Sequence, residues 1–175
     1  MDCDIRLKMV KAKYMNINTL VLLDVPGKNK IAVLSNIAKA TKQEGLITND
    51  RTISAELLKT IENKPDIAEN GFAFPTVYLK DPILSSSAFI LCRAKNPIDF
   101  NSQDGKPVQF IVISFIKNNS TSRSLKEMLL ITRLLKDAGF LKIFKGTQNR
   151  SEVTLLLKKA LQGSYLDYTA GSQRN

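Results

Sequence analysis

The order of hydrophobic patterns along the chain predicts an α+β fold, in which a central mixed β-sheet is flanked by helices in a three-layer α/β/α arrangement. One short apolar run comes first, two segments with helical spacing follow, three strand-like runs come next, and helical spacing then returns. Strands and helices therefore come in blocks, which is typical of a mixed sheet and not of a regular βαβ repeat. The 175 residues have the size of one ordinary domain. We expect an N-terminal extension at 1–14, the domain at 15–162 and a flexible tail at 163–175.

The first half of the chain is predicted to hold one buried strand and two amphipathic helices. Residues 18–25 include four consecutive aliphatic side chains, a pattern that suits a buried strand, and a proline-glycine pair ends the run. Helical spacing follows from Lys28 and ends at Gly45, because glycine favours the position after a helix. The polar cluster at 49–52 predicts the start of the second helix, which stops before Pro65.

Three strands are predicted in the middle of the chain, at 71–79, 87–94 and 108–116. Each run is rich in phenylalanine, isoleucine and valine and is bounded by turn residues. Pro75 lies within the first run and is predicted to interrupt its hydrogen-bond ladder. Turns are predicted at Asp81-Pro82, Asn96-Pro97 and Asp104-Gly105.

Helical spacing returns after Ser120. Ser124 and Glu127 are spaced as a capping box, in which each side chain bonds an amide of the first turn. We expect Gly139 to end this helix and a last helix to begin near Asn149. The residues predicted on the buried sides are Leu125, Met128, Leu129, Thr132 and Leu135 for the first helix, and Val153, Leu156, Leu157 and Leu161 for the second.

The sequence contains no histidine and two cysteines, which excludes several kinds of site. Without imidazole the chain lacks the commonest general base and the commonest metal ligand, and no phosphohistidine can form. Cys3 and Cys92 make no ligand-like pair, so we expect no disulfide framework, no metal site and no cofactor, with Cys92 a buried hydrophobic residue. No run of eighteen apolar residues occurs and the N-terminus is acidic, so we expect a cytoplasmic protein without membrane insertion.

The formal net charge is +10. The marked local excess of positive charge lies between Lys117 and Arg150, a stretch that contains eight basic and two acidic residues. A solvated helix face explains such a stretch without any partner. The basic residues alternate with aliphatic ones and tryptophan is absent, so we do not expect nucleic acid as the partner. A functional interpretation of this charge is an acidic protein partner, whose binding weakens with salt.

Two segments carry a family resemblance. They are residues 70–76, which read Asn-Gly-Phe-Ala-Phe-Pro-Thr, and 96–108, in which Asn-Pro-Ile-Asp-Phe is followed after three residues by Asp-Gly-Lys-Pro-Val. With these motifs the chain resembles the enzyme IIA domains of the bacterial sugar phosphotransferase system, of the fructose, mannitol and nitrogen-regulatory branch, over roughly 15–161. The resemblance implies a cytoplasmic three-layer domain that accepts a phosphoryl group on histidine from a small carrier protein and passes it on or uses it as a signal.

The chain departs from that family pattern at the positions that carry the chemistry. The motif places Thr76 where the family has its phosphoacceptor histidine, Ser124 where a second histidine stands, and Thr60 where the family has an arginine. Asp66 and Glu69 replace the small residues that usually precede the acceptor, and their carboxylates would repel a phosphoryl group. A purely structural interpretation is also open for both residues. In it, Thr76 is a strand residue whose hydroxyl bonds locally, and Ser124 is the N-cap of a helix.

The sequence therefore favours a regulatory module that cannot be phosphorylated on histidine, and we expect it to act by protein binding and not as an enzyme. The alternative is a phosphotransfer or sugar-transport component with a different acceptor, Thr76 or Ser124, modified by a separate kinase. Most aromatic rings near Thr76 are expected in the core. Any that remain exposed would form a docking surface, whose candidate residues are Asn70, Gly71, Phe72, Phe74, Pro75 and Tyr78.

Overall fold

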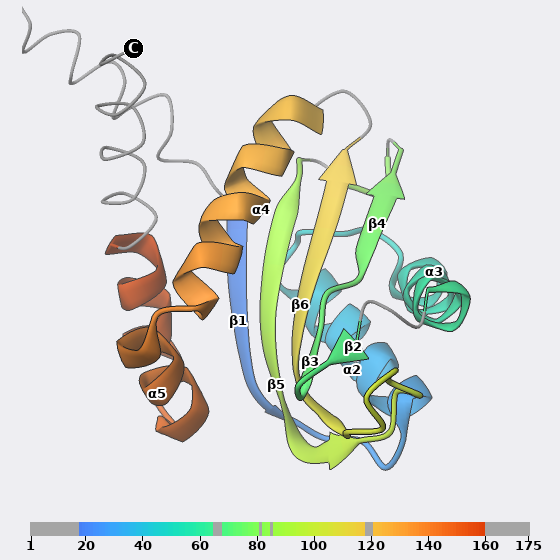
Figure 1. Ribbon diagram of the computed structural model, residues 1–175. Helices are drawn as coiled ribbons and strands as arrows, with labels where there is room; N and C mark the ends of the chain where they lie inside the picture. Colours follow the sequence, from blue (N-terminus) through green and yellow to red (C-terminus); the bar gives the residue numbers. More distant parts are fainter. Residues whose placement is uncertain (1–17, 65–67, 81, 85, 118–120, 160–175) are drawn as a thin grey trace, which may run out of the picture. The chain divides into compact units, whose positions relative to one another are not determined.

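The computed structural model describes residues 18–64, 68–80, 82–84, 86–117 and 121–159 (Figure 1). The chain divides into two compact units, and the described residues lie in Asn18–Ser124 and in the part of Leu125–Asn175 up to residue 159. The first unit holds the sheet, two helices and the first four residues of α4 (Thr121–Leu135), and the second holds the rest of α4 and the helices after it. No helix among the described residues is long and apolar enough to cross a membrane.

The first unit is built on six strands: β1 (Asn18–Val25), β2 (Ala68–Glu69), β3 (Phe72–Ala73), β4 (Thr76–Leu79), β5 (Ala88–Ile98) and β6 (Val108–Lys117). Their order is β1-β5-β6-β3-β2, and β4 also pairs with β6. β1 runs parallel to β5, β3 and β4 run parallel to β6, and the β5–β6 and β2–β3 pairs are antiparallel. The predicted α+β class with a mixed sheet is thus confirmed.

Two helices, α2 (Lys30–Gln43) and α3 (Asp50–Asn63), pack on each other and cover one face of this sheet (Figure 1). Asn29 and Asn49 cap their N-termini, since each side-chain oxygen accepts a hydrogen bond from the amide three residues on. Gly45 follows α2 with φ +73°, as predicted for a residue just past a helix. Buried residues of the shared core include Leu34, Ile37, Ile53, Leu57, Ile90, Ile113 and Phe115.

The strand predicted at 71–79 is divided at Pro75 into β3 and β4. Ala73 pairs with Ile111 and Thr76 with Ser114, so the register along β6 is unbroken. Pro75 has no amide hydrogen to donate, whereas its carbonyl oxygen accepts a hydrogen bond from the amide of Ser114 at 3.0 Å. The predicted interruption of the ladder is confirmed.

The predicted turn at Asn96-Pro97 is wrong, because β5 runs through both residues to Ile98. The pairing of β5 with β6 is irregular between Arg93 and Ile98, and a sheet accommodates proline at such an irregularity. The turn at Asp104-Gly105 is confirmed, with Gly105 at φ +67° and its amide bonded to the carbonyl oxygen of Ser102. Asp81 lies outside the described residues.

The second unit contains most of α4 (Thr121–Leu135), α5 (Ala138–Gly146) and a helix at 150–159. The prediction that Gly139 ends a helix is wrong. α4 ends four residues earlier, and Asp137 caps α5 by accepting a hydrogen bond from the Phe140 amide at 2.8 Å. The last helix begins as predicted, since the Asn149 side chain accepts a bond from the amide of Ser151 at 3.0 Å.

The capping box predicted for Ser124 and Glu127 is also wrong, because α4 begins at Thr121 and Ser124 lies within its first turn. The predicted buried side of α4 is wrong in part. Leu125 and Leu129 are exposed, since α4 carries aliphatic residues around most of its circumference and periodicity alone does not select its inner side. The aliphatic residues of α4 that are buried are Leu130, Ile131 and Leu135. In the last helix Val153 and Leu157 are buried as predicted, whereas Leu156 is only partly buried and Leu161 lies outside the described residues.

Candidate functional site

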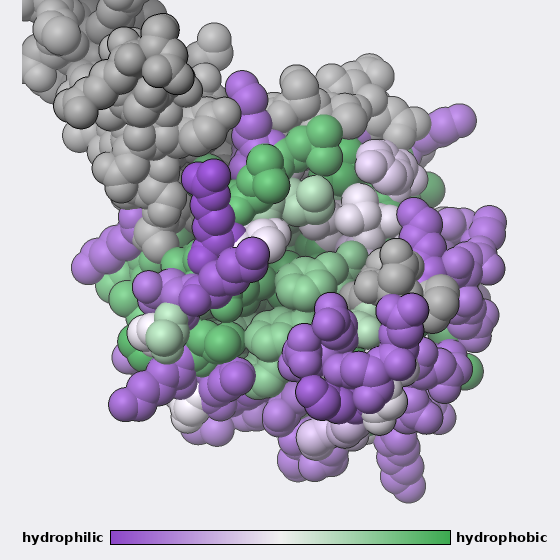
Figure 2. Space-filling view, in the orientation of Figure 1, coloured by the Kyte–Doolittle hydropathy of each residue, from purple (hydrophilic) through white to green (hydrophobic). Residues whose placement is uncertain are grey.

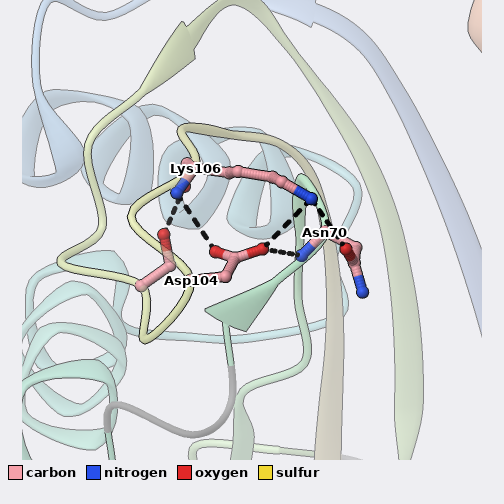
Figure 3. Close-up of polar contacts among 4 residues, drawn as sticks. Asn70, Asp104 and Lys106 are labelled. Atoms are coloured by element: carbon pink, nitrogen blue, oxygen red, sulfur yellow. Dashed lines mark hydrogen bonds and ion pairs between the residues drawn. The ribbon is translucent and has the colours of Figure 1, made fainter.

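The two sequence motifs meet at a polar junction (Figure 3). The Asp104 carboxylate accepts hydrogen bonds from the backbone amides of Asn70 at 2.8 Å and of Lys106 at 3.1 Å. The Lys106 ammonium donates to the side-chain oxygen of Asn70 at 3.1 Å and lies 3.8 Å from the carboxylate. These bonds, the one from Asn70 above all, lower the pKa of Asp104. The junction therefore ties the start of β3 to the loop before β6.

Backbone conformation explains the asparagine-glycine pair of this junction. Asn70 has φ +52° and Gly71 has φ +82°, a region in which glycine and asparagine are the usual residues. The Gly71 carbonyl oxygen accepts hydrogen bonds from the amides of both Gln109 and Phe110, at 2.9 and 3.0 Å. The motif residues at this end thus hold β3 beside β6 and have a structural role that needs no phosphoryl group.

Strand register places a row of side chains on the sheet face opposite to the α2–α3 core. Arg93 pairs with Phe110, and Phe110 pairs with Phe72, while Ser114 pairs with Thr76 two rows further along. Paired residues point to the same side of a sheet, and so do residues two apart on one strand. These five side chains therefore share one face.

Three aromatic residues of this face form what we call the aromatic surface: Phe72, Phe74 and Tyr78. The Phe72 ring stacks between Phe110, with centroids 5.0 Å apart, and Phe74, with centroids 5.9 Å apart. Phe110 is buried, but Phe74 is 40% and Tyr78 58% exposed. Figure 2 shows apolar side chains exposed over this part of the sheet and bordered by hydrophilic residues. Part of the predicted aromatic cluster is thus exposed.

Thr76, the predicted counterpart of the phosphoacceptor, is half-buried at the start of β4. Its neighbour in register on β6 is Ser114, which in turn pairs with Phe89 on β5. A site that transfers a phosphoryl group needs cationic or amide donors around the acceptor. The residue beside Thr76 in register is the neutral Ser114, and Phe89 lies one strand further away.

The other predicted site residues are engaged locally or are buried. The Thr60 hydroxyl donates to the Glu56 carbonyl oxygen at 2.8 Å, within its own helix. Ser124 is 1% exposed, and its Oγ has no hydrogen-bond partner among the described residues. Glu69 is exposed on β2 opposite Phe72, and Asp66 lies outside the described residues.

Within the predicted docking surface, Asn70 is exposed and Gly71 and Phe72 are partly exposed, whereas Pro75 is buried and offers no side chain to a partner. The junction in Figure 3 brings Asn70 together with the second motif, which is 34 residues away along the chain.

Sequence reasoning missed a buried ion pair on the same sheet face. The Arg93 side chain is 3% exposed, and its Nε and Nη2 atoms lie 3.0 and 3.1 Å from the two carboxylate oxygens of Asp24. Asp24 has φ +54° at an irregularity in the pairing of β1 with β5. An arginine inside an apolar strand was the available signal, because a buried guanidinium needs a partner.

The remaining candidates for chemistry are metal ligands and the Cys92 thiol. No group of three or more histidine, cysteine, aspartate or glutamate side chains is placed there to hold a metal ion. Burial raises the pKa of Cys92, so this cysteine is held as an unreactive thiol, as predicted for a buried hydrophobic residue.

Comparison with known proteins shows the family and the fold. The family model "Phosphoenolpyruvate-dependent sugar phosphotransferase system, EIIA 2" matches residues 15–160. The chain is 27% identical over 128 residues to a nitrogen regulatory protein of Bradyrhizobium diazoefficiens, which covers 73% of this chain and 81% of that protein. It is 25% identical over 84 residues to a nitrogen regulatory protein homolog of Haemophilus influenzae, covering 48% of this chain and 51% of that protein.

Solved structures agree with the fold. The nitrogen regulatory protein IIA-Ntr of Neisseria meningitidis superposes with a TM-score of 0.64 at 17% identity, over 81% of this chain and 92% of that one. Enzyme IIA-Mtl of Escherichia coli, solved in a complex with phosphorylated enzyme IIB-Mtl, gives a TM-score of 0.62 at 16% identity, over 78% and 92% of the two chains.

Proposed function

The chain belongs to the EIIA type-2 family of the phosphoenolpyruvate-dependent sugar phosphotransferase system, and we propose that within this family it is a regulatory binding module that carries no phosphoryl group. One observation carries the proposal, namely that the sequence contains no histidine. A phosphorylated imidazole holds its phosphoryl group through a reactive N–P bond, and a phosphoester on Thr76 or Ser124 would not reproduce that reactivity.

The surroundings of Thr76 support this function. Its neighbour in register on β6 is Ser114, a neutral residue, and the Thr60 hydroxyl is bonded within its own helix. The aromatic surface, which includes the exposed Phe74 and Tyr78, lies on the same sheet face and offers apolar area to a protein partner. We propose that a partner protein binds to the aromatic surface through shape complementarity and apolar contact, and that this binding does not require a phosphoryl group.

The kind of partner is suggested by a relative of the same fold. The Escherichia coli structure contains enzyme IIA-Mtl in a complex with phosphorylated enzyme IIB-Mtl, so this fold presents a surface to another protein. The net charge of +10 favours an acidic partner for this chain, because opposite charges speed association and raise its salt dependence.

Phosphoryl transfer from phosphoenolpyruvate tests the proposal. The full chain is incubated with labelled phosphoenolpyruvate and the general phosphotransfer proteins, and a histidine-bearing IIA-Ntr serves as the positive control in the same mixture. We expect label on the control and none on this chain. Acid-labile phosphate on the chain would refute the proposal. The Thr76→His variant should also stay unlabelled, because Thr60 and Ser124 still occupy the positions at which the family resemblance implies an arginine and a second histidine.

The alternative, a phosphotransfer component that uses a hydroxyl acceptor, requires a separate kinase to reach Thr76 or Ser124. Ser124 is 1% exposed, so its modification would require α4 to open locally. A threonine phosphoester is also a poor phosphoryl donor. Phosphorylated Thr76 would therefore serve as a regulatory mark and would not pass its phosphoryl group to another protein. Phosphopeptide mapping of the chain from its native cell, with Thr76→Ala and Ser124→Ala variants, separates the two functions. A phosphopeptide abolished by either substitution favours the kinase route.

A further inference from the structure

One side of α4 is apolar and exposed. Leu125 is 43% and Leu129 58% exposed, and the two residues are one helical turn apart with the half-buried Met128 beside them. The buried side of the helix is a different one, which carries Leu130 and Ile131. Leucines at this spacing usually face a core, so the sequence is patterned for a second contact that the described residues do not make.

Cations flank these leucines. Lys126 and Arg133 are both exposed, and neither forms an ion pair with a described residue. Arg133, in the last turn, is favoured by the helix dipole. The dipole does not favour Lys126, because this residue lies in the second turn, toward the end where the dipole favours an acid. The two cations therefore give the apolar side of α4 a positive border, which an acidic partner would complement.

We propose that this α4 stripe, made of Leu125, Lys126, Met128, Leu129 and Arg133, docks a short acidic amphipathic segment of another protein. The segment presents two large apolar side chains about one helical turn apart, with carboxylates on both sides of them. Leucines supply the apolar contact, and the two cations select the negative charge.

The size of the stripe limits the length of the partner segment, and its charge argues against a second copy of this chain. From Leu125 to Arg133 the stripe extends about 12 Å along the helix, which matches roughly two turns of a partner helix and a small, transient interface. A second copy of this chain is a poor occupant, because its stripe and its net charge of +10 carry the same sign. An anionic membrane and nucleic acid share the sign of the proposed partner and must be separated from it by experiment.

This inference rests on the proposed function in naming the chemistry of the bound partner, but it is tested without any phosphoryl donor. Failure of the docking experiment therefore leaves the labelling result standing, and labelling of the chain leaves the docking result standing.

The experiment titrates the full chain into a fluorescent synthetic helix of about sixteen residues, with leucines at i and i+4 flanked by glutamates. A second peptide has the same charge with both leucines replaced by serine. Vesicles of phosphatidylglycerol and phosphatidylcholine and a DNA duplex are the other probes. The variants are Leu129→Ser and Arg133→Glu, matched by Leu155→Ser and Lys158→Glu on the helix at 150–159, where Leu155 is 53% exposed and Lys158 is exposed.

We expect the leucine peptide to bind, and the serine peptide to bind at least about tenfold more weakly. Leu129→Ser and Arg133→Glu should each weaken binding about fivefold or more, and the matched variants by less than twofold. The affinity should also fall with added salt. No binding, equal affinity for both peptides, equal loss in the matched variants, or tighter binding to vesicles or DNA would each overturn the proposal.

Discussion

Asp24 combines an ion pair with a backbone conformation that few residues adopt, and substitutions there separate the two effects. Its carboxylate makes a bidentate contact with Arg93, at 3.0 and 3.1 Å, and its φ is +54°. The Arg93 side chain is 3% exposed and the Asp24 side chain 39%. Breaking a fully buried pair costs about 3 to 5 kcal/mol, and breaking an exposed one less than about 1 kcal/mol. Because the carboxylate is partly solvated, we expect the loss of this ion pair to lower the free energy of unfolding by about 2 kcal/mol.

The backbone adds a second, separable contribution. A residue with a Cβ other than asparagine or aspartate costs about 1 to 2 kcal/mol in the left-handed region, whereas glycine costs nothing there. Asp24→Gly should therefore lower the free energy of unfolding by about 2 kcal/mol, and Asp24→Ala by about 3 to 4 kcal/mol. Asn101→Gly is the matched control, because Asn101 has φ +55° and makes no ion pair, so its free energy of unfolding should stay unchanged or rise slightly.

Urea unfolding at neutral pH, followed by far-UV circular dichroism, measures these differences. Both effects should leave the dependence on urea unchanged, since neither changes the surface exposed on unfolding. Equal losses for Asp24→Gly and Asp24→Ala would refute the backbone argument. Losses below about 0.5 kcal/mol for both variants would refute the ion pair as a stabilising contact.

Three further predictions concern local packing, pH and the predicted site. Gly27→Ala should lower the free energy of unfolding by about 1 to 3 kcal/mol, because a Cβ there would lie 2.7 Å from the Val33 amide nitrogen, while Gly146→Ala, with no neighbour within 4 Å, should change it by less than about 0.5 kcal/mol in urea unfolding. The lowered pKa of Asp104 stabilises the fold above the ordinary value of 3.8, so acid titration toward pH 2 should cost the natural chain more stability than Asp104→Asn, and equal losses would contradict this. Thr60→Val should leave both stability and the absence of labelling unchanged within error, and a change in labelling would give Thr60 a role that its helical hydrogen bond does not indicate.

Local patterns in the sequence predicted most of the elements of the fold. The apolar run at 18–25 is β1, and the side chains of Asn49 and Asn149 cap helices as expected, because strand burial and helix capping depend on nearest neighbours along the chain. Pro75 breaks the ladder for an equally local reason, its missing amide hydrogen.

The errors arise where distant residues decide. Asn96-Pro97 has the composition of a turn but continues β5, because irregular pairing with β6 accommodates it. The exposed side of α4 could not be selected from periodicity, since aliphatic residues surround the helix. The Arg93–Asp24 pair joins residues 69 positions apart, a separation at which no local pattern identifies the partner.

The sequence predicted the position of the candidate site, but it did not predict which residues surround it. The sequence places Thr76 within the strand predicted at 71–79. The structure places Thr76 at the start of β4, with Ser114 beside it in register and Phe89 one strand further away, which required the order and direction of β4, β5 and β6. Exposure of Phe74 and Tyr78 likewise depends on what lies over the sheet and not on the residues themselves.

The phosphorylation state of the chain inside its own cell tests the central claim most directly. Intact-mass spectrometry at neutral pH, on protein isolated rapidly from cells grown with and without a phosphotransferase sugar, detects a phosphoryl group on any side chain. The proposed function predicts one unmodified mass under both conditions. A species heavier by one phosphate, whose abundance follows the sugar supply, would contradict it.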